Sequence, residues 1–152
     1  MSRNPSFHAV PRGGIDPIQS AADALAVLAL GAPYGDDTIV ILLDADRCGT
    51  SVMVVTDTIG PDALFRVIDC CIGVSAQYSG APKKPGAVFD AVILASSRPD
   101  GDAEPDDVHR WLEASDQCRA GGLKLVEWFV LGRSGPTCPR QLVGEPERWT
   151  RT

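Results

Sequence analysis

Residues 92–109 read VILASSRPDGDAEPDDVH and contain the strongest structural pattern in this chain of 152 residues. A short, fully apolar run is typical of a strand that is covered on both faces, and here it predicts a strand over residues 87–95. The polar loop after it covers residues 96–105. Asp106 is then expected to be the N-cap of a helix, because a carboxylate at that position accepts hydrogen bonds from free backbone amides.

Strands and helices alternate on both sides of this stretch. Upstream, Ser20 and Asp23 have the spacing of a capping box, and two apolar runs predict a β-hairpin. This order predicts an α/β fold with one mixed sheet, flanking helices, and the strand from Thr38 at the centre of the sheet. In addition to the strand and helix above, the expected elements are a helix over residues 21–30, strands over 38–43 and 52–56, a helix that opens at 60–62, and a strand over 123–131.

The chain length fits one domain. Residues 1–19 contain several prolines and glycines and are expected to form a flexible N-terminal arm. Residues 20–132 contain all the predicted strands and helices. Residues 133–152 are expected to be a tail that packs on this domain.

Composition and charge exclude several classes of function. The net charge is −6, and the sequence contains no run of Lys or Arg that would suggest a basic patch. Nucleic acid is therefore not expected as a partner. No apolar run approaches the roughly 18 residues that a membrane span requires. The first 16 residues lack the apolar core of a signal peptide. The cytoplasm is therefore the expected location.

Five cysteines are present, an odd number, and none form a C-x-x-C motif. In a reducing compartment, free cysteine packs as a small apolar residue. We expect five free thiols and no disulfide. A zinc cluster or a catalytic thiol is the alternative that this pattern leaves open.

Residues 92–109 resemble the RadC-type branch of the JAB/MPN (JAMM) family. There, an apolar strand is followed by His-Asn-His-Pro-Ser-Gly, then by Glu-Pro-Ser and by an Asp three residues after that Ser. The resemblance extends over about residues 36–132 and implies a JAB/MPN-like, cytidine deaminase-like architecture. The residues that match in register are Pro99, Gly101, Glu104, Pro105 and Gly132.

The family's metal site is mostly replaced. The family binds zinc through two His and one Asp, and a Glu acts as general base on the zinc-bound water. The two His positions are Ser96 and Arg98 here, the Asp position is His109, and the base falls near Asp36, with Asp37 beside it. Arginine is a permanent cation and cannot ligate a metal. We therefore expect no bound metal and no cofactor, and we assign no catalytic residue.

The resemblance implies that the vacated site is formed by Asp36, Ser96, Arg98, Asp106 and His109. Arg98 is expected to take the place of the lost cation and to pair with Asp36, Asp37 or Asp106. The first hypothesis for function is a catalytically inactive JAB/MPN-like domain. It would act as a protein-binding or scaffold module, through a protein partner or self-association.

Two alternatives belong to other classes. A metal-independent hydrolase would use Ser96 with His109 as base and Asp106 as carboxylate. A residual JAMM-like hydrolase would bind metal through Asp36 or Asp37, Asp106 and His109. The plainest interpretation gives these residues no chemistry: Asp106 caps a helix, His109 lies on its surface, and Arg98 is solvated.

Overall fold

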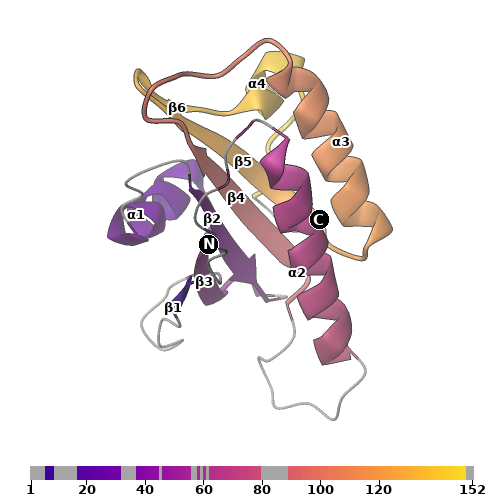
Figure 1. Ribbon diagram of the computed structural model, residues 1–152. Coiled ribbons are helices and arrows are strands. Elements are labelled where there is room, and N and C mark those ends of the chain that lie inside the picture. The colour runs from indigo at the N-terminus through magenta and orange to yellow at the C-terminus, as the bar shows by residue number, and fades with distance from the viewer. Residues whose placement is uncertain are drawn as a thin grey trace, which may run out of the picture.

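The computed structural model describes residues 6–8, 17–31, 37–44, 46–55, 58, 60, 62–79 and 89–149. Figure 1 shows the helices and strands of this part of the chain. In chain order they are β1 (Ser6–His8), α1 (Ala21–Gly31), β2 (Thr38–Leu43), β3 (Gly49–Val55), α2 (Ala63–Ser79), β4 (Ala91–Ser97), α3 (Asp107–Ala120), β5 (Lys124–Gly132), β6 (Gly135–Thr137) and α4 (Pro139–Val143).

The six strands form one mixed sheet in the order β1-β3-β2-β4-β5-β6. Strands β2 and β3 form the predicted antiparallel hairpin, and β2 also pairs antiparallel with β4. Strands β4 and β5 are parallel and are connected by α3. The predicted central position of the strand from Thr38 is confirmed, and each of its side chains is buried.

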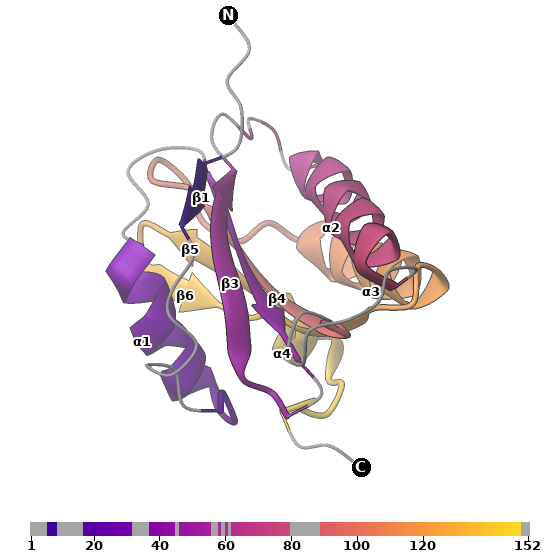
Figure 2. The same ribbon diagram turned by 90° about the horizontal axis from the view of Figure 1, so that it is seen from below.

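Helices cover both faces of this sheet. In Figure 2, α1 lies on one side of the strands and α2 and α3 lie on the other. Alternate residues of β2 enter the two cores, as the pleat of a strand requires: Val40 and Leu42 pack with α2 and α3, whereas Ile39 and Ile41 pack with α1. The mixed α/β fold with flanking helices is therefore confirmed.

The local signals at helix ends have mixed outcomes. The Ser20 hydroxyl accepts a hydrogen bond from the Asp23 amide at 3.1 Å, as predicted for a cap. By contrast, Asp106 precedes α3 but makes no side-chain capping bond. The neighbouring Asp107 carboxylate instead accepts the Glu104 amide at 2.6 Å. Asp106 therefore holds the predicted N-cap position, but the capping hydrogen bond expected from its side chain is absent.

Both ends of the chain contribute to the fold beyond the sequence expectation. Within the arm predicted over residues 1–19, β1 pairs with β3 and Ile18 is buried at 1% exposure. In the tail, β6 extends the sheet and Trp149 is buried against Phe129, with ring centroids 6.3 Å apart. The described part of the tail therefore packs on the domain.

Candidate functional site

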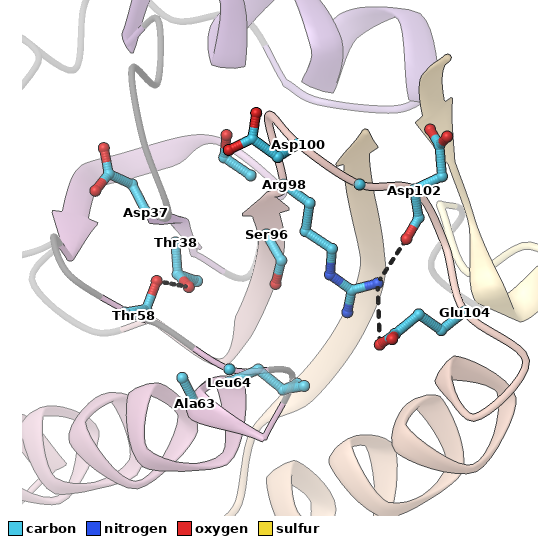
Figure 3. Close-up of a pocket in the computed structure, with 13 residues that line it drawn as sticks. Asp37, Thr38, Thr58, Ala63, Leu64, Ser96, Arg98, Asp100, Asp102 and Glu104 are labelled. Carbon is cyan, nitrogen blue, oxygen red and sulfur yellow. Dashed lines mark hydrogen bonds and ion pairs between the residues drawn. The ribbon is translucent and has the colours of Figure 1, made fainter. Parts of the chain in front are cut away.

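An open pocket of about 320 Å³ lies where β4 ends. Three elements meet there because of the register of the sheet: Thr38 at the start of β2 is opposite both Val55, the last residue of β3, and Ser96 near the end of β4. The chain therefore enters α2 and leaves β4 at the same edge. Figure 3 shows Ser96, Arg98, Thr38, Ala63 and Leu64 around the pocket.

Arg98 lines this pocket as a cation, and the other charged residues that line it are acidic. Its Nη1 and Nη2 atoms donate to the two carboxylate oxygens of Asp107 at 2.7 and 2.9 Å. Nη1 also donates to the Asp102 carbonyl at 3.2 Å. Only 16% of the Arg98 side chain is exposed, and the Asp107 side chain is fully buried. Arg98 pairs with a carboxylate, as predicted, but its partner is Asp107, which was not among the predicted partners.

Asp107 is the centre of a larger ion-pair network. Its carboxylate also accepts a hydrogen bond from Arg110 at 2.9 Å. Desolvation by burial would raise its pKa, but hydrogen bonds from Arg98, the Glu104 amide and Arg110 outweigh this effect and lower the pKa below its ordinary value. Asp107 is therefore an ionised carboxylate shared by two guanidinium groups.

Ser96 and Trp128 fix the position of the arginine. The indole Nε1 of Trp128 donates to the Ser96 hydroxyl at 2.9 Å, and the Arg98 guanidinium lies 5.9 Å from the centre of the indole ring. This distance is within the range of a cation–π contact. Side chains from β4, β5 and α3 thus hold the guanidinium in one orientation.

The other residues expected at the vacated site are less central. Asp37 lines the pocket, and Asp36 lies outside the described residues. Asp106, which precedes α3, and His109, in its first turn, are exposed and are not among the residues that line the pocket. No hydrogen bond in the described part of the chain joins Ser96 to His109 or His109 to Asp106. The predicted convergence is therefore found for Ser96 and Arg98 only.

The loop that carries Arg98 is held closely to the end of β5. The Arg98 amide donates to the Leu131 carbonyl at 2.9 Å, and the Arg133 amide donates to the Gly101 carbonyl at 2.7 Å. A side chain at Gly132 would meet the Gly101 carbonyl oxygen and the Asp102 Cα atom at 2.8 Å. Gly132 is therefore required for this close approach.

The residues present do not fit a zinc ion. Arg98 occupies the pocket as a permanent cation, which would repel a metal and cannot ligate one. Among the described residues, no group of three or more His, Cys, Asp or Glu side chains is arranged to hold a metal ion.

All five cysteines are free thiols. Burial raises the pKa values of Cys71, Cys118 and Cys138 to about 12. These three thiols stay protonated at neutral pH, which makes them poor nucleophiles. Cys70 is exposed and Cys48 is half-buried.

A second buried ion pair escaped the sequence analysis. Glu127 lies within β5, where an apolar side chain is expected, and Nε of Arg140 donates to its carboxylate at 2.9 Å. Both side chains are almost fully buried, at 1% and 5% exposure. Burial raises the pKa of Glu127, and Arg140 opposes that rise only in part. A charged residue in the middle of an apolar strand was the available signal.

No protein-family model, curated protein or solved structure matches this chain. Among the described helices, none is long and apolar enough to cross a membrane. The site is therefore interpreted from its own geometry.

Proposed function

We propose that this chain is a catalytically inactive JAB/MPN-like domain that works as a protein-binding or scaffold module. The observation that carries the proposal is the bidentate pair between Arg98 and Asp107, with distances of 2.7 and 2.9 Å. In the family that the sequence resembles, the position of Arg98 belongs to a zinc ligand. In this chain the guanidinium would supply the positive charge that a metal supplies in that family.

The strand–loop–helix–strand segment supports the JAB/MPN-like assignment. Strands β4 and β5 are parallel and α3 connects them. Gly101 and Gly132, two of the residues that match the family in register, are neighbours in space through the close approach of their backbones. The partner proposed is another protein or a second copy of the chain, since an inactive domain of this kind acts through association. Five free thiols fit the cytoplasm as its compartment.

The geometry gives less support to the hydrolase alternatives. A serine nucleophile requires a base within hydrogen-bond reach, whereas the Ser96 hydroxyl accepts the Trp128 indole and His109 is exposed. A metal site through Asp106 and His109 would place the ion outside the pocket, on the surface of α3.

The test combines three measurements on protein purified without chelators: elemental analysis, peptide and isopeptide hydrolysis with added zinc, and mass in solution. The proposal predicts substoichiometric zinc and no hydrolysis above the rate of buffer. A dimer or larger species would identify a second copy as the partner, and a monomer would require a different protein. Stoichiometric zinc, or hydrolysis that His109→Ala abolishes, would contradict the proposal.

A further inference from the structure

The guanidinium of Arg98 has donors left over. Arginine carries five N–H donors, and its bonds to Asp107 and to the Asp102 carbonyl use three of them. The Nε–H and the second hydrogen of Nη2 donate to no residue that the structure describes. These two hydrogens are parallel and form the side-on edge of the guanidinium, which matches the two oxygens of a carboxylate.

Ser96 adds a third donor to the same space. The Trp128 indole nitrogen is a donor only, so its 2.9 Å contact requires the Ser96 oxygen to accept. The hydroxyl hydrogen of Ser96 then remains to donate, and no acceptor for it lies among the described residues. In Figure 3, Ser96 and Arg98 project into the pocket side by side, and Nη1 is turned away toward Asp102 and Glu104.

Of the charged groups in this ion-pair network, the two guanidinium groups and the Asp107 carboxylate are the ones largely removed from water. Arg98 and Arg110 share the single buried carboxylate of Asp107. The other acidic partners are Glu104, with 53% of its side chain exposed, and Asp62, with 79% exposed. Water and salt screen these outer carboxylates much more than they screen the buried pair. The free edge of Arg98 is therefore a position where an anionic group would meet a weakly screened guanidinium charge.

We propose that this pocket binds a ligand through a single carboxylate group, held by the side-on edge of Arg98 and by the Ser96 hydroxyl. The acidic lining favours this ligand over a phosphate: Asp37 and Asp100 also line the pocket and, in Figure 3, lie apart from the Arg98 guanidinium. They would repel a doubly charged anion and attract a positive group at the far end of the ligand. A volume of about 320 Å³ is at the small end of ligand pockets.

Two kinds of ligand could supply this carboxylate group. A free α-amino acid carries a carboxylate with an ammonium group that would face Asp37 and Asp100. The C-terminus of a polypeptide carries the carboxylate with a neutral amide next to it. This inference rests on the donors of the pocket and not on the proposed JAB/MPN-like function, so either can fail without the other.

The direct test observes the Nε–H group of Arg98 by ¹⁵N NMR, with its signal assigned by its loss in Arg98→Lys. The probes are acetate, glycine, N-acetylglycine and inorganic phosphate at matched ionic strength. We expect a saturable shift of the Arg98 signal with the carboxylate probes, while the signal of the exposed Arg133 stays in place. Ser96→Ala should weaken carboxylate binding roughly fivefold through the loss of one hydrogen bond.

The choice of probe distinguishes the two sources. Tighter binding of glycine, with the preference lost in Asp37→Asn combined with Asp100→Asn, identifies a free amino acid. Binding of N-acetylglycine at least as tight as that of glycine identifies a chain terminus. The proposal is overturned if no carboxylate probe shifts the Arg98 signal, if phosphate alone shifts it, or if Arg98 and Arg133 respond equally.

Discussion

Arg98 lies at the start of the loop after β4. From the sequence alone, its side chain could be either solvated or paired with a carboxylate. The structure places it against the fully buried Asp107, with a second guanidinium, that of Arg110, on the same carboxylate. The partner was not predictable because Asp106 and Asp107 are adjacent. Successive residues of a helix point about 100° apart, so the inward-facing aspartate depends on where α3 begins.

Arg98→Ala should destabilise the fold. It removes a bidentate, charge-assisted pair from a carboxylate that is fully buried, although Arg110 still neutralises it in part. We expect a loss of about 1–3 kcal/mol in the free energy of unfolding, measured by urea denaturation. Arg133→Ala, at an exposed position, is the matched control and should change stability by less than about 0.5 kcal/mol. Equal effects of the two substitutions would show that the Arg98 pair contributes nothing.

Stability should fall in acid because of Asp107. Its pKa in the folded state is lowered, so its contribution is complete above the unfolded pKa, about 3.9 for an aspartate, and is lost as the pH falls through the folded pKa. Urea denaturation from pH 7 downward should show this loss below about pH 4. Asp107→Asn should flatten that part of the curve. An unchanged slope in the variant would assign the acid sensitivity to other groups.

At the scale of elements, uninterrupted apolar runs predicted the strands well. The run from Thr38 to Leu43 has the predicted bounds, and the later β5 strand is shifted by one residue. Strand β4 starts at Ala91 rather than at residue 87, and residues 87 and 88 lie outside the described part. Strands β1 and β6 and helix α4 were missed. Each has only three to five residues. Such a segment is too short to show a hydrophobic periodicity or a clear secondary-structure propensity in the sequence.

Gly132 connects β5 to the loop that carries Arg98. Gly132→Ala would place a methyl group 2.8 Å from backbone atoms of Gly101 and Asp102. Because backbone cannot move as easily as a side-chain end, we expect a loss of about 1–3 kcal/mol. Gly73→Ala is the control: it lies on the exposed face of α2 with open space around it. It should leave stability unchanged or raise it by up to about 1 kcal/mol. Both values come from chemical denaturation.

The buried pair of Glu127 and Arg140 joins β5 to α4. Glu127→Gln leaves the Arg140 charge buried without its partner and should cost about 3–5 kcal/mol. Replacing both residues, Glu127→Leu with Arg140→Met, removes the desolvation penalty as well. Thermal denaturation should find the double variant much closer to the natural chain than the single one. A double variant at least as unstable as Glu127→Gln would show that the pair is needed for more than mutual neutralisation.

For the whole molecule, the sequence predicted a mixed sheet with flanking helices but not the arrangement of the site. Fully apolar strands require cover on both faces, and α1 covers one face of the sheet while α2 and α3 cover the other. The spatial relation of Ser96, Arg98, Asp106 and His109 depended instead on the rotation of α3. That rotation directs Asp107 inward and leaves Asp106 and His109 in solvent, which sequence register alone does not determine.

The central claim is that Arg98 holds the place of a lost metal in an inactive JAB/MPN-like site. Zinc titration of the double variant Ser96→His with Arg98→His, beside the natural chain, tests it most directly, because the buried Asp107 carboxylate faces position 98 whereas His109 is exposed outside the pocket. We expect the folded variant to bind stoichiometric zinc and the natural chain to bind none. Adding Asp107→Asn identifies the carboxylate that completes the site. A variant that keeps its circular dichroism spectrum but gains no zinc, or a natural chain that binds zinc as tightly, would contradict the claim.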